Sequence, residues 1–336
     1  MASTTYPIST AIDCPEKVDY SKASGKSVIV TGGSSGLGAA YVRAFADNRF
    51  ASPVSEEYWD LRYLAEHSVR YVQCDVRNWQ DQLTAFKSAI AHSPQHCIDI
   101  VIANAGISGS DEFFEGAYPP ISVMEDDINA SEDDGDEPRQ PRTGILEINL
   151  LSLVYTAKLA MHYMKRQGPQ FDRCLILKSS IMGFLDTNGS PTYGAAKHGV
   201  RGLMKCLRRR SGLRVNVVAP WYIATPLMSD AVMNTLTTQL KEQGSGFALV
   251  EDSVKAVMRI ATDDSINGEL LPCFMDQNES SVCDVGRSIA VLPRETSKSG
   301  YLDLDLDDFK TGSLYHDLQT ICSNLTHRQL PPQEQK

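Results

Sequence analysis

The chain has 336 residues, of which 42% are hydrophobic and 22% are charged, so it can bury a large apolar core. Its net charge of −10 is concentrated in one place: the segment from Asp111 to Glu137 holds eleven acidic residues and no Lys or Arg, which leaves about +1 for the rest. A nucleic-acid-binding protein presents a basic face, and this sequence predicts none.

The N-terminal residues lack a basic region followed by an apolar core, and no run approaches the roughly eighteen apolar residues of a membrane span. The eight cysteines form no CxxC pair and no Cys/His cluster at metal-ligand spacing. We therefore expect a soluble cytoplasmic protein with reduced thiols, no metal, and neither a membrane nor a nucleic acid as its partner.

Apolar, strand-like runs alternate with helical patterns from about residue 25 to 275, which is typical of a parallel sheet covered by helices on both faces. The expected strands are 26–30, 69–74, 98–103, 174–177 and 213–218. This pattern predicts an α/β fold, a Rossmann-type doubly wound parallel sheet, as a single domain over residues 23–275. Residues 1–22 and 276–336 are interpreted as extensions.

Two segments fall outside this alternation. The acidic insertion at about 107–143 contains Pro and Gly and is predicted to be a mobile loop, which either shields the active-site mouth or is a plain surface insertion. The alternation from Tyr301 to Leu306 indicates one short amphipathic strand or an extended docking segment.

A glycine-rich turn, Thr31 to Gly38, follows the first expected strand. Gly32 permits a tight turn, Gly36 lets the main chain approach a pyrophosphate, and Gly38 allows a helix to pack closely on the sheet. The N-terminus of that helix supplies free amides and a positive dipole end for a phosphate. The turn therefore predicts a dinucleotide site.

Tyr193 and Lys197 are four residues apart, so a helix places the phenol and the ammonium side by side. A neighbouring cation favours the phenolate, so Lys197 is expected to lower the pKa of Tyr193 and make it a general base. Alone, this spacing is more typical of a solvated helix face. Ser180, thirteen residues upstream, and Asn149, in a helical stretch, favour the catalytic interpretation.

Together these motifs resemble those of the short-chain dehydrogenase/reductase family, in the family's order and over about residues 25–275. Within that family the chain is similar to fungal members and to NAD-dependent 15-hydroxyprostaglandin dehydrogenases. The resemblance implies a nicotinamide dinucleotide cofactor. The cofactor-binding residues that it implies are Gly32, Ser34, Gly36, Leu37, Gly38, Asp75, Val76, Asn104, Ala105, Gly106, Tyr193, Lys197, Ile223 and Thr225.

The resemblance also implies the catalytic roles. Tyr193 exchanges the substrate proton, Ser180 binds the substrate oxygen, and Lys197 holds the nicotinamide ribose. Asn149 holds a water that links Lys197 to solvent. Ser179 is an alternative to Ser180, although the spacing favours Ser180. For Asn149 the alternative is a polar side chain that bonds a kinked helix backbone, and Asp75 could instead cap the helix that follows it.

The sequence departs from the family pattern in three places. Trp221 follows Pro220 where glycine is expected, which makes any positive φ there doubtful. The region of the second strand is short and contains Pro53. The helix that begins near Tyr193 also meets the next strand early. By resemblance this helix and the one holding Asn149 pair in a homo-oligomer, so that surface is affected.

A basic residue before the middle glycine is typical of NADP-preferring relatives, because it pairs with the 2′-phosphate. Ser35 stands there, and residues 53–57 offer no base, although Arg49 is near in sequence. We therefore predict a preference for NAD, with NADP as the alternative.

The segment after Thr225 is expected to cover the substrate, because apolar residues recur there at helical spacing; core packing is the alternative. These residues are Leu227, Met228, Ala231, Val232, Leu236 and Leu240. With Phe184, Leu185 and Trp221 nearby, they favour a small-molecule substrate, namely a bulky hydrophobic alcohol or ketone. By resemblance this is a fungal specialised metabolite, such as a terpenoid or polyketide. The competing hypothesis is a dinucleotide-binding protein of this fold without turnover.

Overall fold

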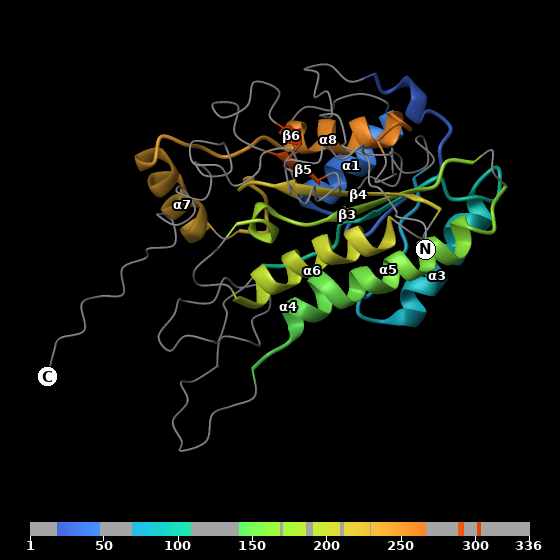
Figure 1. The fold of residues 1–336 in the computed structure, drawn as a ribbon, viewed down its shortest axis with the longest axis horizontal. Helices are drawn as coiled ribbons and strands as arrows, with labels where there is room; N and C mark the ends of the chain where they lie inside the picture. The colour runs from blue at the N-terminus through green and yellow to red at the C-terminus, as the bar shows by residue number, and fades with distance from the viewer. Residues whose placement is uncertain are drawn as a thin grey trace, which may run out of the picture.

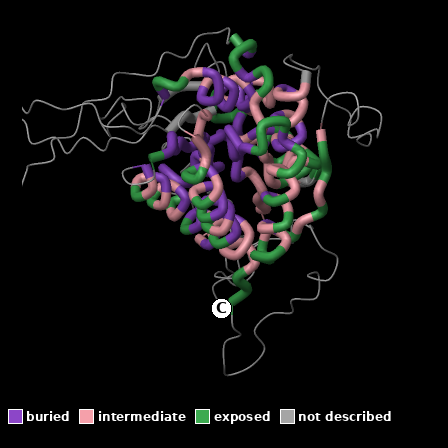
Figure 2. The backbone as a smooth tube through the Cα atoms, turned by 90° about the vertical axis from the view of Figure 1, so that its right-hand side faces the viewer, coloured by how far each residue is buried: buried purple, intermediate pink, exposed green. Residues whose placement is uncertain are grey.

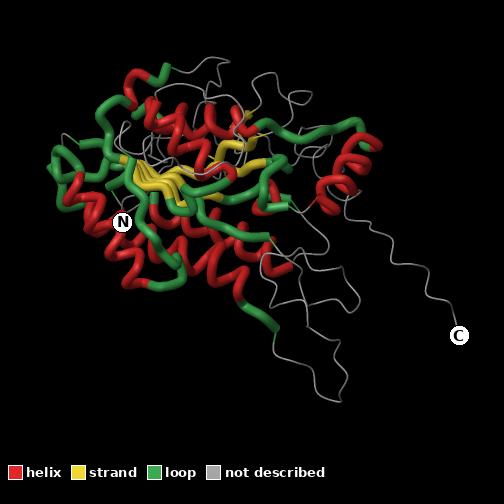
Figure 3. Tube along the Cα trace, turned by 180° about the vertical axis from the view of Figure 1, so that it is seen from behind, coloured by secondary structure: helices red, strands yellow, loops and turns green. Residues whose placement is uncertain are grey.

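The computed structural model places a six-stranded sheet between two layers of helices (Figures 1 and 3). The strands follow each other across the sheet in the order β1-β2-β3-β4-β5-β6. The structure describes residues 19–47, 69–108, 141–168, 171–185, 191–208, 212–228, 230–266, 288–291 and 301–303. The acidic insertion from 109 to 140, residues 48–68 with Pro53, and residues 304–306 lie outside these ranges.

Five strands run parallel and the last is antiparallel. They are β1 (Val28–Val30), β2 (Ile100–Ala103), β3 (Cys174–Lys178), β4 (Arg214–Pro220), β5 (Ser288–Val291) and β6 (Tyr301–Asp303). Every residue of β2, β3 and β4 is buried. Strands covered on both faces are expected to be apolar throughout, and this explains their Val, Ile and Leu content.

Helices cover both faces of this sheet. In Figure 1, α1 (Gly36–Asp47) and α8 (Val250–Thr262) lie above it, and α3 (Trp79–His92), α5 (Ser152–Met164) and α6 (Pro191–Leu207) lie below it. The buried residues gather in the middle of the molecule (Figure 2). The predicted doubly wound Rossmann-type fold is confirmed.

Four short elements and one further helix complete the described chain. The short elements are η1 (Ser21–Ala23), α4 (Gly144–Leu146), the π-helical turn η3 (Glu147–Leu151) and the 3₁₀ turn η4 (Ile181–Gly183), and the helix is α7 (Asp230–Glu242). The continuous helix from Gly144 to Met164 is long and apolar enough to cross a membrane by length and composition. Its α5 part, however, buries Leu153, Leu159 and Met164 in the core, as a core helix does.

Two expectations about the sheet change. The sequence predicts a strand at residues 69–74, but these residues form no strand in the structure. A strand forms only by hydrogen bonding to a neighbouring strand. In the described ranges β1 pairs with β2 alone, so residues 69–74 do not pair with it. Second, β5 and β6 extend the sheet beyond residue 275, and residues 301–303 adopt the strand rather than the docking alternative. The domain boundaries themselves stay a prediction.

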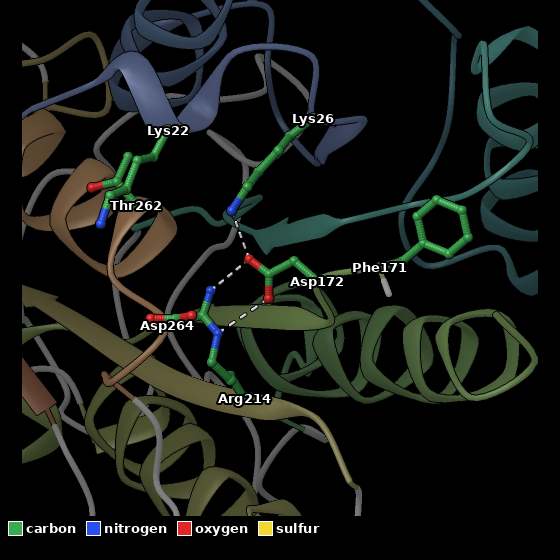
Figure 4. A pocket seen from close by; sticks show the side chains of 7 residues that line it. All are labelled: Lys22, Lys26, Phe171, Asp172, Arg214, Thr262 and Asp264. Carbon is green, nitrogen blue, oxygen red and sulfur yellow. Dashed lines mark hydrogen bonds and ion pairs between the residues drawn. The ribbon is translucent and has the colours of Figure 1, made fainter. Parts of the chain in front are cut away.

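An ion cluster joins three strands at the amino-terminal edge of the sheet, next to a cavity of about 480 Å³ (Figure 4). Asp172, just before β3, contacts Lys26 Nζ at 2.7 Å and Arg214 Nη2 at 2.8 Å. Lys26 also donates to the Ala261 carbonyl, and Arg214 to those of Ile260, Asp263 and Ile266. Because these cations are already committed to internal partners, we interpret the cluster as structural.

Candidate active site

The glycine turn connects β1 to α1 at the carboxyl-terminal edge of the sheet. Gly32 and Gly36 have φ values of 64° and 50°, which glycine adopts without strain. A Cβ on Gly38 would lie 2.0 Å from the Gly32 carbonyl oxygen, so the start of α1 packs directly on the turn. Ser34 and Leu37 lie in the same turn and the first turn of the helix. Here the amides at the start of α1 are grouped, as an anion requires.

The segment after β2 is fastened to this turn. The main-chain amides of Asn104 and Ala105 both donate to Thr31 Oγ1 at 3.0 Å. The Asn104 side chain donates to the Thr31 carbonyl at 3.1 Å. The next residue, Gly106, is close to catalytic candidates, because a Cβ there would lie 2.9 Å from Asn149 Oδ1 and 3.5 Å from Lys197 Nζ. The dinucleotide turn and the predicted catalytic group are therefore neighbours.

The segment after β4 closes the other side of the turn. Thr225 approaches Gly36, since a Cβ built on that glycine would lie 3.7 Å from Thr225 Cβ. Ile223 is buried and forms an isolated bridge with Ala248. Trp221 is also buried, and its indole donates to the Gly246 carbonyl at 3.1 Å. It has no positive φ, so the chain accommodates this bulky residue without the strain that the sequence suggested.

Asp75 and Val76 follow the expected strand 69–74, and the structure decides against the capping alternative for Asp75. The cap of α3 is Asn78, whose side chain accepts from the amides of Gln80 and Asp81. Asp75 instead accepts from the Arg77 amide at 2.9 Å and forms an ion pair with the Arg77 guanidinium. These hydrogen bonds from Arg77 lower the pKa of the Asp75 carboxyl.

The Asn149 side chain is fully buried in the π-helical turn η3. A π turn widens the helix by one residue, and such turns are frequent at functional sites. The Asn149 side chain accepts from the Ile107 amide at 2.9 Å and donates to the Ile107 carbonyl at 2.8 Å. It therefore bonds the main chain after β2 rather than its own helix.

Ser180, Tyr193 and Lys197 come together where β3 ends and α6 begins. The Ser180 hydroxyl lies close enough to the Tyr193 phenol to lower its pKa, and Lys197 Nζ lies 5.4 Å from the centroid of the Tyr193 ring. Ser179 instead points toward α6, where its hydroxyl donates to the Lys197 carbonyl at 2.8 Å. The pairing with Tyr193 favours Ser180 over Ser179 as the substrate-facing serine.

Burial controls the protonation of this group. It raises the pKa of Tyr193, an effect that the nearby Ser180 hydroxyl partly offsets. Burial also lowers the pKa of Lys197 to about 8. The pKa of Tyr193 is thus raised rather than lowered as expected, because loss of hydration is the main cause of its shift.

Sequence reasoning missed several residues that shape the site. A Cβ on Gly183 would lie 2.4 Å from Ser179 Oγ and 2.6 Å from the Lys197 carbonyl, so this glycine lets η4 pack against α6. Ser108 Oγ donates to the Leu227 carbonyl at 3.1 Å and joins two loops of the site. Only the position of Gly183, three residues after Ser180, gave a signal in the sequence.

The expected substrate stripe divides into two parts. Leu236 and Leu240 are buried in the core, as are Phe184, Leu185 and Trp221, so these residues take the core-packing alternative. The expectation that these three side chains would border the substrate is not supported by their burial. Leu227 is exposed, whereas Met228 and Val232 are half-buried.

The sequence profile of the family described as short chain dehydrogenase matches residues 26–235. The chain belongs to this family. In sequence this short-chain dehydrogenase is 34% identical over 273 residues to 5′-hydroxyaverantin dehydrogenase of Dothistroma septosporum, which covers 76% of the chain and 86% of the relative. An NADP-dependent dehydrogenase of Cochliobolus lunatus is 28% identical, covering 76% of the chain and 91% of the relative.

The fold has solved counterparts as well. Aldohexose dehydrogenase of Thermoplasma acidophilum, in its ligand-free form, superposes with a TM-score of 0.52 over 70% of this chain and 87% of that one, at 22% identity. Short-chain dehydrogenases use a nicotinamide dinucleotide. The family and the named dehydrogenases among its relatives show a dehydrogenase that acts on CH–OH groups, so the hypothesis of a binder without turnover is set aside.

The residues present fit this cofactor. The glycine turn, with positive φ at Gly32 and Gly36, leads directly into the N-terminus of α1, whose free amides would hold a pyrophosphate. Lys197, which is 4% exposed, donates one N–H to the Lys178 carbonyl at 3.3 Å, and its ammonium has further donors for ribose hydroxyls. The bound nicotinamide supplies the hydride acceptor or donor.

Proposed function

We propose that this enzyme interconverts a secondary alcohol and a ketone on a bulky hydrophobic substrate, such as a terpenoid or polyketide intermediate. The observation that carries the proposal is the half-buried Ser180–Tyr193 pair beside the buried Lys197 at the carboxyl-terminal edge of the sheet. Two of the relatives are named 5′-hydroxyaverantin dehydrogenases, from Dothistroma septosporum and Emericella nidulans, which supports a specialised metabolite as the substrate.

In this proposal each side chain has one task. Ser180 donates a hydrogen bond to the substrate oxygen and holds it near the Tyr193 phenol. Tyr193 gives a proton to that oxygen during reduction and removes it during oxidation, over a hydrogen-bond distance of about 2.6–3.2 Å. Lys197 binds the ribose, and Asn149 holds the Ile107 main chain and a water that connects Lys197 with solvent. Ser180 and Tyr193 serve both oxidation and reduction.

Apolar groups at the mouth favour a hydrophobic substrate. Leu227 is 38% exposed, and its carbonyl is held by Ser108 at the border of the site. The half-buried Met228 adds a flexible apolar side chain, which adapts to irregular ligands. A sugar-specific site would instead need several convergent polar groups.

For the cofactor we propose a preference for NAD. Ser35 precedes Gly36 and offers no cation for a 2′-phosphate, and the guanidinium of Arg77 is paired with Asp75. Two relatives are named NADP-dependent, so the comparison of both dinucleotides is decisive. Fluorescence titrations should give a lower Kd for NADH than for NADPH; tighter binding of NADPH would overturn this preference.

A substrate panel tests the reaction. Aromatic polyketide alcohols, terpenoid alcohols, the corresponding ketones and aldoses would be assayed with both dinucleotides, and dinucleotide absorbance would be followed. We expect kcat/KM to be highest for a bulky hydrophobic member, and Leu227→Asp to lower that value more than it lowers the value for a small alcohol. A preference for aldoses, or an equal effect of Leu227→Asp on all substrates, would contradict the proposed substrate class.

A further inference from the structure

Lys178 is a buried lysine that the reaction described above does not use. It is the last residue of β3, directly before Ser179 and Ser180, and it is 6% exposed. Its side chain lies on the face of the sheet covered by α1 and α8, whereas the Ser179 hydroxyl lies toward α6. Successive side chains of a strand point to opposite faces, so one residue step separates the catalytic layer from the layer that holds α1.

The Lys178 amine has two hydroxyl partners. It bonds to Tyr41 Oη of α1, and it lies 3.1 Å from Ser253 Oγ of α8. These two hydroxyls bond to each other at 2.6 Å, so the three groups close a ring. Tyr41 and Ser253 are fully buried. In the part of the chain that the structure describes, no carboxylate contacts the Lys178 amine.

Every hydroxyl hydrogen finds an acceptor within the ring only when the amine is uncharged. Lysine as –NH₂ has two donors and a lone pair, and each hydroxyl has one donor and can accept. Lys178 then donates to Ser253, the two hydroxyls share a hydrogen bond, and the lone pair of the amine is available as the acceptor that one hydroxyl hydrogen needs. An ammonium would have no lone pair, so one buried hydroxyl hydrogen would lose its acceptor within the ring, which is unfavourable.

Lys197 reinforces this state. Its Nζ donates to the main-chain carbonyl of Lys178, so the two lysines are in direct contact. Burial and the charge on Lys197 both lower the pKa of the Lys178 amine well below its ordinary value. The charge on Lys197, on the catalytic side of the sheet, thus disfavours a second charge on Lys178.

We propose that Lys178 is a positioning residue: its uncharged amine joins Tyr41 and Ser253 in a ring of hydrogen bonds that fixes α1, and with it the glycine turn, against the strand that carries Ser180. Tyr41 lies on the helix whose first turn holds Gly36 and Gly38. Displacement of that helix moves the phosphate-binding amides relative to the catalytic serine. The ring therefore acts on dinucleotide affinity, although none of its members touches the dinucleotide.

Three variants test this inference by dinucleotide titration and steady-state kinetics. Lys178→Met keeps the length of the side chain, and Tyr41→Phe opens the same ring from α1. Each should raise the Kd for the dinucleotide about five- to tenfold, because one or two net hydrogen bonds are lost. The double variant should be no weaker than the worse single one, since both changes open one ring. With saturating dinucleotide, kcat should stay within about twofold.

Thr262→Val is the matched control. It removes a buried hydroxyl from the same helix as Ser253, but that hydroxyl bonds only within α8, to the Met258 carbonyl at 2.8 Å. Its melting temperature should fall while its Kd for the dinucleotide is unchanged. If Lys178→Met and Tyr41→Phe behave like this control, the ring is merely structural and the proposal is wrong. Should Lys178→Met fail to fold, Tyr41→Phe alone decides between these results.

A separate measurement addresses the charge. Lysine side chains labelled with ¹⁵N at Nζ give different chemical shifts for an amine and an ammonium, and Lys178→Met assigns the signal. We expect the Lys178 signal to be that of an amine at pH 7. An ammonium signal at that pH would contradict the ring as drawn.

Discussion

Burial dominates the chemistry of individual residues at this site. The pKa of Tyr193 is raised and that of Lys197 is lowered to about 8, and the main cause is the same for both: the charged form loses hydration. The neutral phenol that results is the form that donates a proton to a ketone. For oxidation the phenol must lose that proton, so oxidation is favoured by a higher pH than reduction.

The pKa of Lys197 gives a pH prediction. Because it lies below its ordinary value, at about 8, the ammonium is present at neutral pH and is lost as the pH rises through that value. The value of kcat/KM for the dinucleotide, which reports groups of the free enzyme, should therefore fall above about pH 8.

Lys197→Arg retains a positive charge at every accessible pH. This variant should have lower activity, because the guanidinium does not match the ammonium geometry, but its alkaline decline near pH 8 should disappear. A full pH profile of both proteins makes the comparison. If the variant keeps the same decline, another group titrates there and the assignment to Lys197 is incorrect.

At the scale of elements, the junction of β1 and α1 is the tightest part of the site. A methyl group on Gly38 would meet the Gly32 carbonyl oxygen at 2.0 Å and Asn104 Nδ2 at 2.7 Å. We predict that Gly38→Ala shifts α1 and raises the dinucleotide Kd by more than about tenfold. Calorimetric titration measures this directly.

Gly202→Ala is the matched control for that change. Gly202 lies in α6, and a Cβ there has no neighbour within 4 Å, so alanine should stabilise the protein by about 0.5–1 kcal/mol and leave the Kd unaltered. Equal affinity in Gly38→Ala and Gly202→Ala would show that the close packing of α1 on the turn is unimportant for dinucleotide binding.

The sequence predicted elements whose signals are local. The strands β2, β3 and β4 match their apolar runs to within two residues, and the glycine turn precedes α1 as expected. Three features depend on partners far along the chain and were not predictable: the missing strand at 69–74, the π turn around Asn149, and the ring of Lys178, Tyr41 and Ser253. Only the ring had a visible sign in the sequence, a lysine inside an apolar strand.

For the molecule as a whole, the two edges of the sheet have different roles. The carboxyl-terminal edge carries the site, and the amino-terminal edge carries the ion cluster of Lys26, Asp172 and Arg214. This cluster joins the starts of β1, β3 and β4, which are distant in sequence. We therefore assign stability to one edge and chemistry to the other.

Asp172→Asn tests that division. It removes the shared anion and leaves two cations at the edge, so the free energy of unfolding should fall by about 3 kcal/mol at pH 7. The ion pairs lower the pKa of Asp172 below its unfolded value. Their contribution is thus present above the unfolded pKa, about 4, and is lost as the pH falls through the folded pKa.

Urea denaturation at several pH values measures this effect. The difference between the two proteins should shrink below about pH 4, and the KM for the dinucleotide should remain unchanged at pH 7. A variant as stable as the wild type, or one whose loss is confined to dinucleotide binding, would contradict a structural role for the cluster.

The central claim is that Tyr193 transfers the substrate proton, and Tyr193→Phe tests it most directly. Phenylalanine keeps the ring over which Lys197 lies and removes only the hydroxyl next to Ser180. With the best substrate of the panel, kcat should fall by about 10²–10⁴, while the dinucleotide Kd changes little. If Tyr193→Phe retains most of the wild-type kcat, proton transfer by Tyr193 is excluded and the account fails.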